Sequence, residues 1–229
     1  LKTKGHSIEG KKVAVSGFGN VAWGAVTKAT QLGAKVVTIS GPDGYIYDAD
    51  GISGEKIAYM EEMLRIDRMS VAPYAQKFKT AQFHAGKRPW EQKVDVALPC
   101  AIQNELNLDE AKTLLANGCL AVVEGANMPS TLDAVEFFQA NTDKIIFSPG
   151  KASNAGGVAT SGLEMSQNSM RLGWTAEEVD ARLHQIMINI HKSCVDAAAR
   201  FGTPGNYVNG ANIAGFLKVA DSMIDQGLV

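Results

Sequence analysis

The chain has little of what marks membrane, secreted, zinc-binding or nucleic-acid-binding proteins. It contains no apolar run of about eighteen residues and no cleavable signal pattern, so we expect neither a membrane span nor secretion, and place the protein in the cytoplasm. Its three cysteines, Cys100, Cys119 and Cys194, show no Cys-x-x-Cys spacing, which argues against zinc and a disulfide framework. The formal net charge is −2 and no Lys/Arg block is present, so we expect no nucleic-acid partner.

Glycine is abundant instead, with 23 residues, and one glycine-rich segment is the most informative part of the chain. A short β-branched run ends in Gly-x-Gly-x-x-Ala at residues 17–22. Gly17 allows a sharp turn, Gly19 lets a pyrophosphate approach the main chain, and Ala22 lets helix and strand pack closely. The N–H groups and the positive dipole end of the next helix would face the phosphates. Residues 35–39 close a βαβ unit of about thirty residues, so a dinucleotide site is favoured over an ordinary turn.

Predicted strands and helices alternate along most of the chain. Strands are expected at residues 12–16, 35–40, 94–98, 119–123 and 144–147, and helices at residues 20–32, 55–68, 73–78, 109–117 and 131–140. Residues 45–53 fit a loop or a short hairpin. Short apolar strands without alternation are typical of a parallel sheet buried on both faces. The predicted fold class is α/β, a doubly wound, Rossmann-like parallel sheet with C-terminal helices.

The last third of the chain is predicted to be helical. One helix opens at residues 154–158 and runs to about residue 172. Thr175 and Glu178 fit a capping box, and the apolar residues that then recur to residue 201 at three- and four-residue steps indicate a long helix. We interpret this apolar stripe as core packing. Residues 212–226 form a last predicted helix.

Ligands of an open parallel sheet bind beyond the carboxyl ends of its strands. Small residues, amides and hydroxyls follow the predicted strands, at residues 17–20, 40–43, 99–101, 124–127 and 148–151. Proton-transferring groups are scarce there: Lys151 is the only lysine, and a solvated role suits it equally well. Neither a His/Cys cluster nor a Ser-His-Asp arrangement is recognisable. Because hydride transfer needs a proton-handling group near the substrate, we expect a partner segment to complete any such chemistry.

Several longer segments resemble the hexameric bacterial glutamate dehydrogenases, in the Glu/Leu/Phe/Val dehydrogenase superfamily. They are residues 15–24, 98–105, 124–129, 154–168 and 209–216, in the same order over essentially the whole chain. The resemblance implies the cofactor-binding half of an NAD(P)-dependent enzyme that reversibly deaminates L-glutamate to 2-oxoglutarate and ammonia. The start at Leu1 agrees with a fragment.

In this family an N-terminal domain holds the acid–base lysines and aspartate and makes most hexamer contacts. The resemblance therefore implies a homo-hexamer for the full-length protein and an inactive isolated chain, with no catalytic residue and no metal ligand here. It also implies a dinucleotide-binding domain over residues 1–203 and a C-terminal helical segment over residues 204–229 that packs back toward the N-terminal domain.

The resemblance also implies roles for individual residues. Asn20 would hydrogen-bond near the pyrophosphate, and Asn127 and Asn154 would face the nicotinamide–ribose end. Ile102 stands where the family often has threonine, so any hydroxyl contact to the cofactor is lost there. The full set of candidate cofactor-binding residues is Gly17, Phe18, Gly19, Asn20, Val21, Ser40, Pro42, Asp43, Cys100, Ala101, Asn127 and Asn154.

Val158 and Ser161 would meet the side-chain carboxylate of glutamate. Alternatively, Gly156, Gly157 and Ser161 only allow close helix packing. Two other functions remain open. A branched-chain or aromatic amino-acid dehydrogenase would need an apolar side-chain pocket, which the Ser161 hydroxyl does not suit, and a stand-alone nucleotide-binding module would need no substrate site.

The predicted cofactor is NAD, with NADP or dual specificity as alternatives. Asp43 could accept hydrogen bonds from the ribose hydroxyls and would repel a 2′-phosphate, although it lies further from the glycines than is usual. NADP-using relatives tend to carry a lysine in the next helix, near Leu64 here. Arg65, Arg68 and Ser40 could nevertheless contact a 2′-phosphate.

Overall fold

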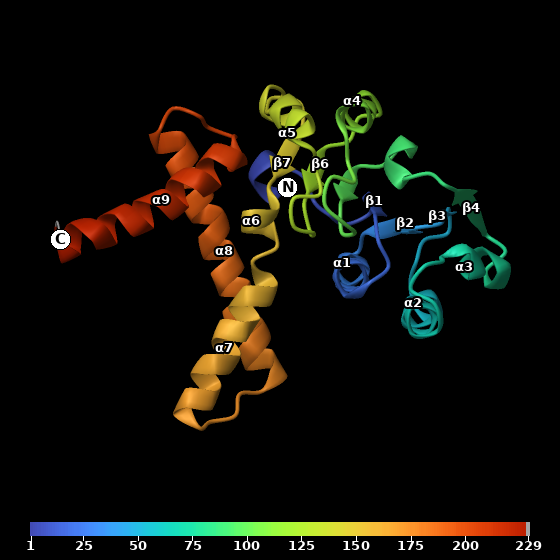
Figure 1. Cartoon of the computed structure of the whole chain (residues 1–229), viewed down its shortest axis with the longest axis horizontal. Coiled ribbons are helices and arrows are strands. Elements are labelled where there is room, and N and C mark those ends of the chain that lie inside the picture. The colour runs from blue at the N-terminus through green and yellow to red at the C-terminus, as the bar shows by residue number, and fades with distance from the viewer. Residues whose placement is uncertain (228–229) are drawn as a thin grey trace. The chain divides into compact units, whose positions relative to one another are not determined.

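The computed structural model describes residues 1–227, and the chain divides into two compact units, Leu1–Ile146 and Phe147–Val229 (Figure 1). The expected domain boundary after residue 203 falls inside the second unit, between two helices that pack together. As a division of a longer subunit it stays a prediction.

A seven-stranded sheet has the order β4-β3-β2-β1-β5-β6-β7. Its strands are β1 (Lys12–Val15), β2 (Lys35–Gly41), β3 (Gly44–Asp48), β4 (Ala81–Ala85), β5 (Val96–Leu98), β6 (Ala121–Val123) and β7 (Ile146–Ser148). The pairs β1–β2, β1–β5 and β5–β6 are parallel. The predicted doubly wound α/β class is confirmed.

Helices lie on both faces of this sheet. Figure 1 shows α1 (Asn20–Gln31) and α2 (Glu55–Ile66) on one side, and α4 (Leu108–Ala116) and α5 (Leu132–Gln139) on the other. Burial on both sides explains the composition of β1, in which Val13, Ala14 and Val15 are all 0% exposed.

The β4 edge of the sheet is antiparallel, which the sequence did not predict. β3 runs antiparallel to β2 and completes a hairpin, one of the two structures expected for residues 45–53. β4, which follows the short helix α3 (Ala72–Lys77), pairs antiparallel with β3. Its sequence, Ala-Gln-Phe-His-Ala, has no β-branched residue, and its pairing with β3, including a stack of His84 on Tyr45 at 4.5 Å, outweighs this low propensity.

Two polar side chains carry the pairing of β1 and β2 beyond a slip in register between Val13 and Ala14. The hydroxyl of Thr38 accepts a hydrogen bond from Val15 N–H and donates one to Val15 C=O, both at 3.0 Å. Ser40, two residues further along β2, makes the corresponding contact to Gly17, the second residue after β1. These contacts hold the end of β1 against β2 up to the turn at Gly17.

A buried carboxylate ties α2 and α3 to the edge of the sheet. Asp48, 0% exposed at the end of β3, pairs with Lys56 Nζ of α2 at 2.6 Å. Its carboxylate also accepts from the Tyr74 hydroxyl of α3 at 3.0 Å and from Thr80 Oγ1 at 3.1 Å. Burial and the adjacent Asp48 carboxylate raise the pKa of Tyr74, so the phenol stays a donor. These contacts fix α2, whose C-terminal end lines the candidate site.

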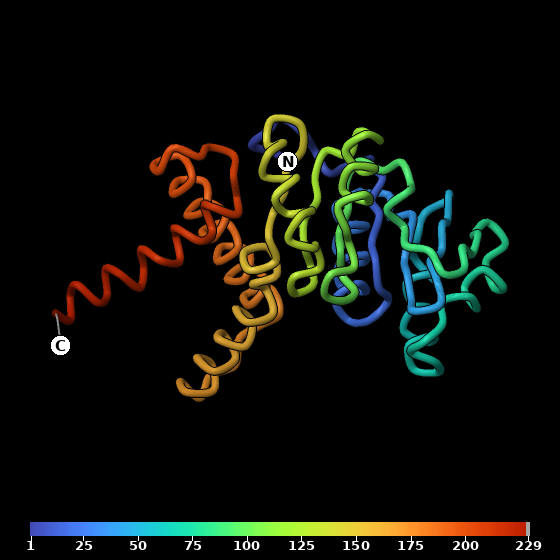
Figure 2. Tube along the Cα trace, turned by 45° about the horizontal axis from the view of Figure 1, so that its top comes forward, coloured from blue at the N-terminus to red at the C-terminus, as the bar shows by residue number. Residues whose placement is uncertain are grey.

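The helices of the second unit are α6 (Gly150–Ser153), α7 (Gly156–Met170), α8 (Ala176–Arg200) and α9 (Tyr207–Gln226). The predicted capping box is confirmed, with Thr175 Oγ1 accepting from Glu178 N–H at 3.2 Å and the Glu178 carboxylate accepting from Thr175 N–H at 2.8 Å. α9 begins earlier than expected because Asn206 caps it, accepting from Asn209 N–H at 3.0 Å. The trace in Figure 2 shows α9 as the last helix of the described residues.

Candidate nucleotide-binding site

The turn after β1 requires glycine at its first position. Gly17 has φ +79°, and a Cβ there would lie 2.9 Å from the carbonyl oxygen of Cys100 and 3.2 Å from Cα of Ala101. Both the backbone conformation and the space exclude a side chain. Gly19 differs, because its φ is −75° and a Cβ there would meet no atom within 4 Å. The fold tolerates a side chain at Gly19, so folding does not explain this glycine.

The N-terminus of α1 presents main-chain donors. Gly19 is its N-cap, and the first intrahelical hydrogen bond runs from Trp23 N–H to Gly19 C=O at 2.8 Å. Among the described residues no side chain caps this end, and the first turn carries no acidic residue. Asn20 and Val21 are exposed, whereas Ala22 is 0% exposed against the core, as its predicted packing role requires. Uncapped N–H groups and the helix dipole suit an anion.

Ser40 holds the turn in place. Its hydroxyl accepts a hydrogen bond from Gly17 N–H at 2.8 Å, and its own N–H donates to Gly17 C=O at 3.1 Å. The side chain is only 6% exposed. Ser40 thus supports the shape of the turn, and the predicted contact of its hydroxyl to a cofactor stays a prediction.

The Asp43 carboxylate caps the start of α3. It accepts from the Ser70 hydroxyl at 2.6 Å, from Val71 N–H at 3.0 Å and from Ala72 N–H at 3.2 Å. Pro42 beside it is exposed. The predicted ribose contacts of both residues stay predictions, and any such bond to Asp43 would share a carboxylate that already accepts three donors.

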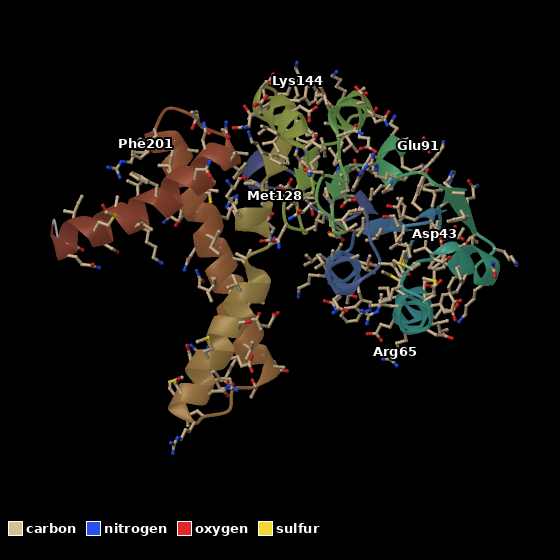
Figure 3. All side chains as sticks on the ribbon, viewed as in Figure 1. Asp43, Arg65, Glu91, Met128, Lys144 and Phe201 are labelled. Atoms are coloured by element: carbon tan, nitrogen blue, oxygen red, sulfur yellow. The ribbon has the colours of Figure 1, made fainter. Side chains whose placement is uncertain are left out.

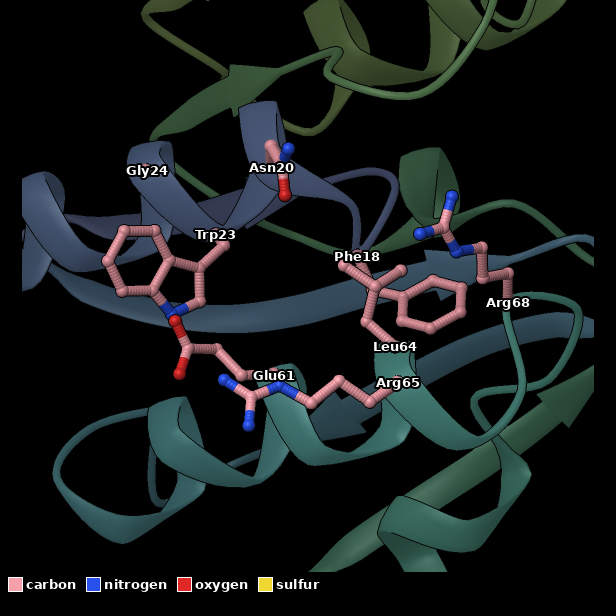
Figure 4. A pocket seen from close by; sticks show the side chains of 8 residues that line it. All are labelled: Phe18, Asn20, Trp23, Gly24, Glu61, Leu64, Arg65 and Arg68. Atoms are coloured by element: carbon pink, nitrogen blue, oxygen red, sulfur yellow. The ribbon is translucent and has the colours of Figure 1, made fainter.

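A groove of about 500 Å³ lies between α1 and α2. It is lined by Phe18, Asn20, Trp23, Gly24, Glu61, Leu64, Arg65 and Arg68 (Figure 4). In Figure 4, Arg68 lies beside the Phe18 ring, and Arg65 extends along Glu61 toward Trp23. Figure 3 shows Arg65 pointing outward from α2, away from the sheet. Two arginines thus line the groove, and Arg68 is the one beside the glycine turn.

Trp23 and Glu61 also line this groove, although they were not predicted as site residues. A signal was present, because residues spaced by three or four share a helix face. That spacing relates Asn20 to Trp23 and Gly24 on one wall, and Glu61 to Leu64 and Arg65 on the other, whereas Arg68 follows the end of α2.

The loop after β5 packs against the glycine turn through a chain of buried hydrogen bonds. Cys100 N–H donates to Ser16 Oγ at 2.9 Å, and the Ser16 hydroxyl donates to Glu105 Oε1 at 2.7 Å. The same oxygen accepts from Ala101 N–H at 3.0 Å. Cys100 and Ala101 therefore lie against the turn, as predicted, whereas Ser16 and Glu105 were not singled out as site residues. Their contacts join segments that are far apart in the sequence, so no local pattern marks them.

Burial shifts the pKa values of two groups in this loop. Desolvation raises the pKa of Glu105 to about 7, although hydrogen bonds from Ser16 and Ala101 oppose the shift. Burial, assisted by the nearby Glu105 carboxylate, raises the pKa of the Cys100 thiol to about 12. At neutral pH this thiol stays protonated, so it is no nucleophile.

The loop after β6 is tied to the same loop. Gly125 N–H and Ala126 N–H both donate to Pro99 C=O at 2.9 Å, and a Cβ on Gly125 would lie 2.6 Å from Cys100 Sγ. Asn127, the predicted nicotinamide-side residue, follows these anchored residues and is exposed. The carboxyl ends of β1, β5 and β6 therefore form one packed set of loops.

The remaining predicted residues belong to the second unit. Asn154 is the C-cap of α6, and Val158 and Ser161 are exposed on α7, three residues apart on one face. A Cβ on Gly156 or Gly157 would meet no atom within 4 Å, so within the described chain close helix packing does not explain these glycines. The roles of Asn154, Val158 and Ser161 stay predictions.

Residues 1–227 contain no group of three or more His, Cys, Asp or Glu side chains placed to hold a metal ion. None of the helices described in that range is long and apolar enough to cross a membrane.

The class that this fold and its loops define is the doubly wound α/β domain of the Rossmann type. The sequence pattern of the Glutamate/Leucine/Phenylalanine/Valine dehydrogenase family matches residues 1–227, and the chain belongs to that family.

Named relatives and a solved structure agree with this family assignment. The chain is 60% identical over 233 aligned residues to an NAD-specific glutamate dehydrogenase of Bacteroides fragilis, covering 100% of this chain and 51% of the relative. It is 53% identical to the NADP-specific glutamate dehydrogenase of Escherichia coli, covering 100% and 50%. A solved glutamate dehydrogenase structure superimposes with TM-score 0.96 at 53% identity, covering 100% and 51%. The chain thus spans about half the length of these relatives.

Proposed function

We propose that this chain is the cofactor-binding half of an NAD(P)-dependent glutamate dehydrogenase, which deaminates L-glutamate reversibly to 2-oxoglutarate and ammonia. The observation that carries the proposal is the uncapped N-terminus of α1 beside a glycine that the fold does not need. The names of the relatives support the reaction and the substrate. A cytoplasmic location and a homo-hexameric full-length protein belong to the same proposal.

In this proposal the residues of the first unit bind and orient. The N–H groups at the start of α1 and the Asn20 amide hold the pyrophosphate, and Gly19 leaves the space for it. Cys100 and Ala101, in the loop after β5, form a wall of the cofactor site. Asn127 binds the nicotinamide–ribose end of the cofactor, and so does Asn154 of the second unit. When bound, the dinucleotide accepts or donates the hydride.

Val158 and Ser161 serve the substrate. The exposed Ser161 hydroxyl suits a carboxylate better than an alkyl side chain, because it can donate a hydrogen bond. That favours glutamate over the branched-chain and aromatic amino acids.

The 229-residue chain is expected to bind NADH without turning over glutamate. Glu105 and the Cys100 thiol lie beside the glycine turn but are only 4% and 6% exposed, so neither is open to a substrate for proton transfer. NADH fluorescence titration should saturate. The absorbance of NADH should stay constant when 2-oxoglutarate and ammonia are added.

The Gly19→Val variant, prepared in the same way, is the control for both assays. It should lose the binding signal, which excludes binding by a contaminating protein. Robust turnover by the chain alone would show that its own residues supply the acid–base chemistry. An absence of NADH binding would contradict the proposed function itself.

NADH is expected to bind more tightly than NADPH. The partly buried Asp43 carboxylate would repel the 2′-phosphate by about 1 kcal/mol per charge at 4 Å in water, or about fivefold in affinity. Leu64 offers no compensating charge. Dissociation constants for both cofactors, measured by fluorescence at matched ionic strength, check this.

The opposite outcome has a specific signature, because Arg65 and Arg68 line the groove beside the turn. Tighter binding of NADPH that weakens in Arg65→Ala or Arg68→Ala would show that these guanidinium groups hold the 2′-phosphate and that NADP is the preferred cofactor.

A further inference from the structure

Beyond the last backbone hydrogen bond between β1 and β5, side-chain hydrogen bonds connect the end of β1 to the loop after β5. The backbone ladder between these segments ends at Ser16 N–H, which donates to Leu98 C=O at 3.2 Å. Beyond it, Glu105 connects the two through one oxygen, which accepts from Ser16 Oγ at 2.7 Å and from Ala101 N–H at 3.0 Å.

The direction of these bonds is fixed. Ser16 Oγ accepts from Cys100 N–H, so its single proton is available for Glu105. Both bonds to Glu105 therefore need an acceptor at Oε1. The carboxylate is 4% exposed, which leaves water little access to replace it.

These bonds set the distance between the glycine turn and the loop after β5, which are both part of the candidate site. Gly17 follows Ser16 directly, and a Cβ on Gly17 would already be 2.9 Å from the Cys100 carbonyl oxygen. The glycine turn and the loop after β5 are thus in close contact, and Glu105 is the side chain that bridges them. A change at Glu105 acts on both loops at once.

We propose that Glu105 is a positioning residue, which holds the glycine turn and the Cys100–Ala101 loop at the separation that the dinucleotide requires. The inference rests on the proposed function. Glu105 acts through Ser16 and Ala101 and does not itself touch the cofactor.

The strength of these bonds depends on the charge of Glu105. Because burial raises its pKa to about 7, the carboxyl is largely ionised at pH 8 and largely protonated at pH 6. Hydrogen bonds to an ionised acceptor are about twice as strong as those to a neutral one. The other ionisable groups around it are the Cys100 thiol and the ion pair between Arg88 Nε and Glu110 Oε1 at 2.8 Å.

Stability and binding should therefore depend differently on Glu105. Because its pKa is raised in the folded state, the carboxyl destabilises the fold as the pH rises from about 4.5, its ordinary value, through about 7. Glu105→Gln removes this penalty while keeping an acceptor for Ser16 and Ala101. Above pH 7 this variant should be at least as stable as the wild type, yet bind the cofactor less tightly.

The test is NADH titration at pH values from about 6 to about 8 on the whole chain. The wild-type dissociation constant should rise about fivefold as the pH falls across this range. Glu105→Gln should show no such step and stay near the weak, acidic wild-type value. Glu105→Ala should bind more weakly still, because two buried donors lose their acceptor.

Glu136→Gln is the matched control, since it removes the same charge from an exposed position on α5. It should reproduce the wild-type pH profile. A Glu105→Gln variant with the wild-type profile would overturn the inference. So would an affinity that increases as the pH falls, which would mean that the carboxylate acts by repelling the phosphates. Wild-type protein that binds no NADH at any pH would contradict the proposed function instead.

Discussion

Replacing Gly19 with valine is expected to weaken cofactor binding strongly while leaving the fold intact. At φ −75° and ψ −169° the backbone is extended, a conformation that valine adopts readily, and no atom lies within 4 Å of the added Cβ. The side chain would occupy the space through which a pyrophosphate approaches the main chain. The loss should be about 2 kcal/mol or more, roughly thirtyfold in the NADH dissociation constant.

Gly17→Ala provides the contrasting variant two residues earlier. Its Cβ would lie 2.9 Å from the Cys100 carbonyl oxygen at φ +79°, so it should lower thermal stability as well as affinity, by about 1–3 kcal/mol. Gly19→Val should lower affinity much more than stability, because valine is only a less favourable N-cap residue, and titration together with a thermal melt checks this. Unchanged NADH titration curves for Gly19→Val would mean that the loop is only a turn.

The sequence predicted the central part of the sheet because its strands are short, apolar and bounded by glycine or proline. The antiparallel edge was harder to predict. β4 contains no β-branched residue, and its pairing with β3 is a long-range contact that no local pattern encodes. The neighbouring strand β3, which forms a local hairpin with β2, was recognisable as one of two alternatives.

The candidate site divides in the same way. Residues whose role is to be small, such as Gly17, Gly19 and Ala22, follow from local spacing, since a turn followed by a helix leaves few other choices. Glu105 and Ser16 lie 89 positions apart and meet only after β1 and β5 have paired. Asp43 could be placed at a strand end, but its capping of α3 depends on where α3 packs.

A second large effect is expected in the second unit, at Gly210 of α9. A Cβ there would lie 2.2 Å from the carbonyl oxygen of Cys194 and 3.2 Å from Cβ of Ala198, both in α8. Gly210→Ala therefore has to separate the two helices at their contact. Overpacking of this kind costs about 1–3 kcal/mol, more than the gain of up to about 1 kcal/mol in helix propensity.

The measurement is hydrogen exchange of the α8 and α9 amides, because it reports on this unit without interference from unfolding of the first. Gly215→Ala is the matched control in the same helix, where an added Cβ meets no atom within 4 Å. It should gain the helix propensity alone and slow exchange, whereas Gly210→Ala should accelerate it. If both variants slow exchange equally, α8 and α9 do not approach each other closely at Gly210, and its lack of a side chain has no packing role.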